Sequence, residues 1–174
     1  MSAGGDKGLP PEEGETKADN VEQLFSAVKE NGSAYEGYNE ILDLLLSLAV
    51  DNNHVGTCSI LLQRGANSNA VNKAGWFPLL SASSNNYREI CELLLSHNAD
   101  VNQANTKTGD TPLHQASIRG HHAIVTLLLR HGASVHSRDK GQFTPLINAS
   151  QEGHLDIVKT LLQHGARWND RQLT

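Results

Sequence analysis

The feature that most constrains the fold is a segment of 33 or 34 residues that recurs along the chain. Its clearest copy, GDTPLHQASIRGHHAIVTLLLRHGASV, occupies residues 109–135, and related segments occupy 44–66, 77–99 and 144–166. A Gly-Ala or Asn-Ala pair closes each copy, and these pairs begin at positions 65, 98, 132 and 165. Self-similarity at this period predicts stacked repeats, because one repeat alone cannot cover its own apolar face.

Each of the last three copies predicts two short helices. A Thr-Pro or Phe-Pro pair begins the first helix, since proline suits the first helical turn. The second helix carries apolar residues at spacings of three and four, as in Ile124, Leu127 and Leu128. Between repeats, polar segments with one glycine, such as 134–143, predict extended hairpins. Each helix should end at a residue in the left-handed conformation: Asn86, Gly120 and Gly153 for the first helices, and Asn98, Gly132 and Gly165 for the second.

The best copy contains Gly-Asp-Thr-Pro-Leu-His at 109–114, Gly-His at 120–121, a leucine triplet at 127–129 and Gly-Ala at 132–133. These residues resemble the ankyrin repeat family. The resemblance implies an all-α solenoid of stacked antiparallel helix pairs with projecting β-hairpin loops. Four full repeats are expected at about 39–71, 72–105, 106–138 and 139–171, three-quarters of the chain.

Departures from the family pattern are informative. Only the third full repeat keeps the motif histidine, His114, which the resemblance implies will hydrogen-bond the neighbouring turn. Phe77 replaces the threonine that caps the first helix in the family pattern. One extra residue around 105–108 predicts a distorted hairpin before Thr111.

The first forty residues differ in composition from the repeats. Residues 1–19 are rich in Gly, Pro and Glu and are expected to form a disordered acidic tail. Residues 20–38 are expected to form a capping helix and a connector, with the connector SAYEGYN at 33–39. Residues 41–49 are apolar almost all round, which predicts a helix covered on two sides. The domain that follows is expected to run over 39–174.

Composition argues against several classes of function. The net charge is −5, of which residues 1–20 supply −3 through five acids and two lysines, so the repeats are nearly neutral. Electrostatics therefore favour neither nucleic acid nor an anionic membrane. The longest apolar run, 41–50, is too short to span a bilayer, and no signal peptide opens the chain. We expect an intracellular protein, cytoplasmic, nuclear or both.

Catalytic and metal chemistry are not expected either. The nine histidines fall mainly into two registers that recur once per repeat, which separates their members too far to share one ion. No serine lies in a Gly-x-Ser-x-Gly elbow and no Gly-rich phosphate loop precedes a helix. Cys58 and Cys91 hold the same place in adjacent repeats and are expected to be reduced, buried side chains. We therefore predict no enzyme activity, cofactor or metal.

The resemblance implies a protein-binding role on the concave side, at the hairpin tips and the exposed ends of the first helices. Trp76 and Phe143 are candidate apolar anchors there, unless they fold onto their own hairpins. A row of basic tip residues favours an acidic and apolar peptide or loop, unless these charges only solvate the surface. The complete candidate set is Lys73, Trp76, Ser84, Asn85, Lys107, Asp110, Ile118, Arg119, Arg138, Lys140, Phe143, Gln151 and Glu152.

Asn102 is a candidate for modification. It follows Leu94 by eight residues within Asp-Val-Asn, which resembles the family's acceptor pattern for asparaginyl β-hydroxylation. The alternative is that its side chain only pins its hairpin.

Several biological roles stay open. An adaptor, scaffold or inhibitor is the leading interpretation, with the substrate-recognition part of a ubiquitin ligase or a kinase-inhibitor-like ankyrin protein as alternatives. The last repeat keeps an interior-like pattern at Ile147, Ile157 and Leu161, which favours further repeats, a partner or self-association at that end.

Overall fold

The computed structural model describes residues 35–167 of the 174-residue chain. The chain divides into two compact units, Met1–Tyr38 and Asn39–Thr174. The acidic tail expected at 1–19 and the capping helix expected from residue 20 lie outside the described residues.

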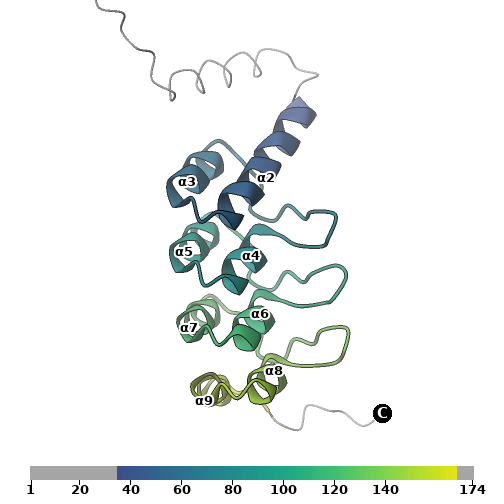
Figure 1. Ribbon diagram of the computed structural model, residues 1–174, viewed down its shortest axis with the longest axis vertical. Helices are drawn as coiled ribbons and strands as arrows, with labels where there is room; N and C mark the ends of the chain where they lie inside the picture. The colour runs from purple at the N-terminus through teal and green to yellow at the C-terminus, as the bar shows by residue number, and fades with distance from the viewer. Residues whose placement is uncertain (1–34, 168–174) are drawn as a thin grey trace, which may run out of the picture. The chain divides into compact units, whose positions relative to one another are not determined.

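The described residues form two columns of helices (Figure 1). The first column holds α2, α4, α6 and α8, and the second holds α3, α5, α7 and α9. From the second repeat on, the two helices of each repeat pack together, and each helix packs on its equivalent in the next repeat. This arrangement confirms the predicted all-α solenoid. The helices are α2 (Tyr35–Asp51), α3 (Val55–Gln63), α4 (Pro78–Ser84), α5 (Arg88–Ser96), α6 (Pro112–Arg119), α7 (His122–Arg130), α8 (Pro145–Gln151) and α9 (Leu155–Gln163).

The predicted start and stop signals are confirmed. Proline occupies the first turn of α4, α6 and α8, after the cap residues Phe77, Thr111 and Thr144. Glycine or asparagine with positive φ follows each helix, because a left-handed residue lets the chain reverse without a clash. The φ angles are +62° at Asn86, +76° at Gly120, +76° at Gly153, +62° at Asn98, +84° at Gly132 and +89° at Gly165.

The core runs between the columns. Its largest fully buried side chains include Leu80, Leu94, Leu113, Ile124 and Leu128, which the helical spacing places on facing sides. Cys58 and Cys91 are free and completely buried, as predicted. Burial raises the pKa of the Cys58 thiol to about 11 and that of Cys91 to about 12.

Three loops project beside the first column (Figure 1): loop 1 (residues 64–77), loop 2 (97–111) and loop 3 (131–144). Loops 1 and 3 each close with a backbone bond from residue i to i+4, Asn72 N to Trp76 O and Asp139 N to Phe143 O. In loop 2 the bond runs from Asn105 N to Asp110 O, over five residues. The predicted extra residue is therefore present. Within residues 35–167 the loops contain no β-strand, since these closing bonds do not extend into a ladder.

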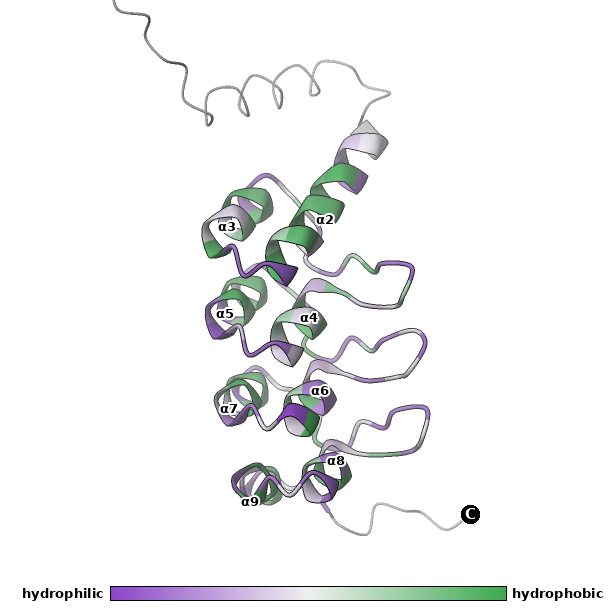
Figure 2. Cartoon of the chain, viewed as in Figure 1, coloured by the Kyte–Doolittle hydropathy of each residue, from purple (hydrophilic) through white to green (hydrophobic). Residues whose placement is uncertain are grey.

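The first helix differs from expectation in two ways. The connector predicted at 33–39 is wrong over Tyr35–Asn39, which belongs to α2. No proline interrupts this stretch, and the cost of one helical glycine, Gly37, is only about 1 kcal/mol. The expectation of cover on two sides is also wrong for the described residues, because Ile41, Leu44 and Leu48 are exposed. Figure 2 shows hydrophobic residues along much of α2.

No helix within residues 35–167 is long and apolar enough to cross a membrane.

Candidate partner-binding surface

The three loops are fastened to one another, so they present their side chains on a fixed frame. Lys140 in loop 3 donates from its backbone nitrogen to Thr108 O at 2.9 Å and from Nζ to Thr106 O at 2.8 Å. Loops 1 and 2 also touch, because a Cβ added to Gly75 would lie 2.5 Å from Asn105 Oδ1. A pre-ordered surface loses little conformational entropy when it binds a partner.

Two asparagine side chains join successive repeats. The Asn69 amide donates to Asn98 O at 3.2 Å and accepts from Asp100 N at 2.8 Å. Asn102 repeats this geometry, donating to Gly132 O at 3.2 Å and accepting from Ser134 N at 2.8 Å. The Asn102 side chain therefore links its loop to the following repeat by hydrogen bonds. It is also exposed to solvent.

His114 makes the structural contact that the family resemblance implied. Its Nδ1 accepts from Thr111 N at 3.2 Å, so Nε2 carries the proton and donates to Phe143 O at 3.1 Å. Burial of the ring lowers the pKa of His114 below its ordinary value, although the bond to Phe143 O opposes this. A neutral, fully buried ring that joins two repeats is a structural element rather than a catalytic base.

The two predicted histidine registers also serve the helix ends. His121 and His154 precede α7 and α9, and their Nε2 atoms lie 3.1 Å from Ser84 O and Ile118 O of the preceding repeat. The other register follows the second helices, where each Nδ1 lies near the carbonyl four residues earlier: His97, His131 and His164, at 2.9, 3.0 and 2.8 Å. Over residues 35–167, no three His, Cys, Asp or Glu side chains gather as a metal site.

The predicted aromatic anchors are only half-buried. The Phe143 ring lies over its own loop, because a Cβ added to Gly141 would be 2.9 Å from Phe143 Cδ2. This placement favours the alternative in which Phe143 folds onto its hairpin. Trp76 is half-buried in the equivalent place on loop 1, and its backbone nitrogen donates to Asn72 Oδ1 at 3.0 Å.

The four residues of the predicted basic row fall into two pairs, one without side-chain hydrogen bonds to described residues and one with them. Lys73 and Lys107 are exposed, and their side chains make no hydrogen bond or ion pair to another described residue. Lys140 is exposed but bonded to loop 2, and the half-buried Arg138 donates from Nη1 to Gln142 O at 3.1 Å. Two of the four cations are therefore free to meet an acidic ligand.

The remaining predicted residues lie at the ends of the first helices and on loop 2. The placement of Ser84 on the accessible surface is wrong, because the side chain is only 7% exposed and packs toward Gln115, with 3.4 Å between Ser84 Oγ and Gln115 Oε1. The half-buried Asp110 accepts from Thr108 Oγ1 and Gln115 Nε2, which occupies its carboxylate within the loop. Ile118 is half-buried, and the exposed members of this set are Asn85, Arg119, Gln151 and Glu152.

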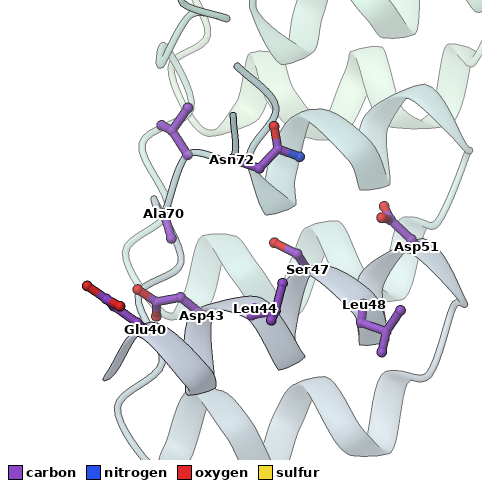
Figure 3. Close-up of a pocket in the computed structure, with 9 residues that line it drawn as sticks. Glu40, Asp43, Leu44, Ser47, Leu48, Asp51, Ala70 and Asn72 are labelled. Carbon is purple, nitrogen blue, oxygen red and sulfur yellow. The ribbon is translucent and has the colours of Figure 1, made fainter. Parts of the chain in front are cut away.

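Sequence reasoning missed a groove between α2 and loop 1. Its volume is about 410 Å³. The signal for this groove in the sequence is the excess of leucine in α2. These leucines were all expected to lie in the core. Figure 3 shows the groove, and its lining residues are Glu40, Asp43, Leu44, Ser47, Leu48, Asp51, Ala70, Val71 and Asn72.

A second cavity of about 410 Å³ lies on the outer face of the last described repeat, between α8 and α9. Ile147, Val158 and Leu162 line it. In the preceding repeat, the equivalents of Ile147 and Val158 are His114 and Val125, which are fully buried where α8 and α9 pack on α6 and α7.

The family model for ankyrin repeats (three copies) matches residues 18–105 and again residues 102–172. No curated protein matches the sequence. Together the two family matches extend over most of the chain and coincide with the observed stack of helix pairs. The chain belongs to the ankyrin repeat family.

Proposed function

We propose that this chain is an adaptor, scaffold or inhibitor that binds another protein along its loops and the adjoining ends of the first helices. Ankyrin repeats are generally protein–protein interaction modules and are typically non-catalytic. The proposal also includes an intracellular location, in the cytoplasm or nucleus, which the free buried cysteines favour.

The observation that carries the proposal is a pair of lysines on neighbouring loops whose side chains make no hydrogen bond or ion pair to another described residue. Lys73 and Lys107 hold equivalent places on loops 1 and 2, and both are exposed. Successive repeats stack at about 8–10 Å, so the two ammonium groups can meet successive acidic residues of one ligand. Such charges steer encounter and set the orientation of the partner.

Apolar contact would come from side chains beside these lysines. Trp76 lies on loop 1 and Ile118 lies near the end of α6. Each side chain is half-buried, so part of it is accessible to a partner. Arg119 is exposed next to Ile118. Tryptophan and arginine are among the residues that contribute most to protein interfaces, so an acidic and apolar peptide or loop is the proposed ligand.

Capture of partners from cell lysate tests this proposal. The variant Lys73→Glu/Lys107→Glu should lose the partners that the wild type captures, whereas Lys159→Glu, an exposed site on α9, should retain them. Trp76→Ala should weaken capture without a matching change in melting temperature. Full capture by the Lys73→Glu/Lys107→Glu variant would contradict the proposal.

The identity of the captured protein then separates the narrower roles. A ubiquitin-ligase subunit or a kinase among the partners would favour the corresponding alternative.

A further inference from the structure

The groove beside α2 has an apolar floor that is open at the surface. Leu44 is 70% exposed, Leu48 is 58% exposed, and Val71 on loop 1 is 44% exposed. All three line the same groove, and Figure 3 shows Leu44 and Leu48 along it. Contiguous exposed apolar side chains of this kind mark interaction sites more often than isolated ones do.

The exposure of Leu44 follows from the way the chain enters the first repeat. By the 33-residue period, Leu44 holds the place of Phe77, which is nearly completely buried at the start of α4. Phe77 is the last residue of loop 1 and caps α4. Leu44, in contrast, lies inside the longer helix α2, which begins at Tyr35. Within residues 35–167, no loop therefore leads to Leu44 as loop 1 leads to Phe77.

Acidic side chains line both ends of this apolar floor. Figure 3 shows Glu40 and Asp43 at one end and Asp51 at the other. Asp43 Oδ1 accepts from Asn67 N at 2.7 Å, and within residues 35–167 no lysine or arginine forms an ion pair with any of the three acids.

The sign of charge is reversed relative to the other repeats. By the same period, the position of Glu40 is held by a lysine in every later repeat: Lys73, Lys107 and Lys140. The groove and the loop lysines therefore select ligands of opposite charge.

The acidic tail of this chain is a poor occupant for the groove. Residues 1–20 carry five acids and two lysines, so their net charge has the same sign as the groove. A segment with positive charge beside apolar side chains would satisfy both the acids and the leucines.

We propose that the groove binds a basic and apolar segment of a partner protein. An apolar side chain of that segment packs between Leu44 and Leu48 against Val71. One basic residue meets Glu40 and Asp43, and another meets Asp51.

The length of the groove sets the spacing of the two basic residues. Glu40 and Asp51 are eleven positions apart on α2, which at 1.5 Å per residue is about 16 Å. An extended peptide rises about 3.3 Å per residue, so its two basic residues should be about five positions apart. The apolar residue lies between them.

Selection from a library of short random peptides, displayed on phage and panned on the full chain, tests this inference. Selected peptides should carry two Lys or Arg residues about five positions apart around an apolar residue. Synthetic copies should bind the Glu40→Lys/Asp51→Lys variant about tenfold more weakly. Leu44→Ser/Leu48→Ser should also weaken binding.

Matched controls separate this site from other surfaces. Ile60→Ser and Leu155→Ser remove exposed apolar residues elsewhere and should leave peptide binding unchanged. Lys107→Glu should also leave it unchanged, which distinguishes failure of the groove from failure of the proposed loop surface. Peptides without basic residues, or equal binding by the groove variants, would overturn the inference.

Accessibility of the groove in the full chain is tested by labelling. In a Leu44→Cys variant, maleimide should react quickly with the new thiol and slowly with the buried Cys58 and Cys91. The selected peptide should slow that reaction. Protection without peptide, relieved when residues 20–33 are deleted, would show that the chain's own segment occupies the groove and would overturn the inference.

Discussion

His114 donates a hydrogen bond from Nε2 to the backbone carbonyl of Phe143, across the boundary between the third and fourth repeats. The ring also accepts from Thr111 N, at the start of its own helix. Both bonds require the neutral ring with its proton on Nε2, because a second proton on Nδ1 would face the Thr111 N–H group.

This geometry predicts that stability falls in mild acid. The folded-state pKa of His114 is lowered by burial, so its contribution is complete above the unfolded value of about 6.5. The contribution is lost as pH falls from there toward the folded-state pKa, since only the unfolded chain binds the proton. Urea unfolding at about pH 7.5 and about pH 5.5 should show this loss.

His114→Leu is the matched variant, because Leu80 fills the equivalent place in the second repeat and is buried. At about pH 7.5 the substitution should cost about 1–3 kcal/mol, since Phe143 O and Thr111 N lose their partner. Its stability should depend less on pH than that of the wild type. The same pH dependence in both proteins would contradict the role assigned to His114.

Gly120 and Gly153 allow a paired test of repeat packing. Both have a φ of +76°, so alanine at either site meets the same backbone strain, about 1–2 kcal/mol. A Cβ at Gly120 would also lie 2.6 Å from His154 Cε1, whereas none of the described neighbours comes within 4 Å at Gly153. Gly120→Ala should therefore melt lower than Gly153→Ala. Equal melting temperatures would mean that the His154 ring moves aside freely.

The side-chain amides between repeats should contribute measurably to stability. Asn102→Ala removes the bonds to Gly132 O and Ser134 N and should cost about 1 kcal/mol. Asn69→Ala removes the equivalent pair between the first two repeats and should cost a similar amount. Denaturant unfolding compares the two variants. A negligible effect at both positions would show that water replaces these bonds.

Hydroxylation of Asn102 stays a prediction. The side chain is exposed, and a hydroxyl on Cβ leaves both amide bonds in place. Protein isolated from its native cells should carry one additional oxygen atom on the peptide that contains Asn102. Intact mass followed by peptide fragmentation measures it, with the peptide containing Asn69 as internal comparison. An unmodified Asn102 peptide would count against the prediction.

The two thiols should be inert while the chain is folded. Their pKa values, about 11 for Cys58 and about 12 for Cys91, leave almost no thiolate near neutral pH. Iodoacetamide should therefore modify them slowly in buffer and rapidly in concentrated urea. Fast modification of either residue in buffer would indicate local opening of its helix pair.

Local sequence signals were sufficient for most of the fold. Pro112 in the first turn and the left-handed Gly120 at the end set the limits of α6. Both act through their own backbone conformation, so these boundaries could be predicted. Tyr35–Asn39 was misassigned because no strong signal marks the start of α2.

The candidate site was less predictable because exposure depends on neighbouring repeats. The burial of Ser84 depends on packing against the next repeat, and the position of the Phe143 ring depends on the fold of its own loop. The groove at Leu44 is open because none of the loops within residues 35–167 covers that position, and the periodic sequence pattern contains no signal for this exposure.

The additional residue in loop 2 has a consequence for how a ligand is aligned. Loops 1 and 3 close over four residues, whereas loop 2 closes over five, between Asn105 and Asp110. A ligand with evenly spaced contacts cannot slide by one repeat and find the same surface again. The irregular loop therefore fixes the register of such a ligand, because only one alignment along the otherwise periodic stack matches all of its contacts.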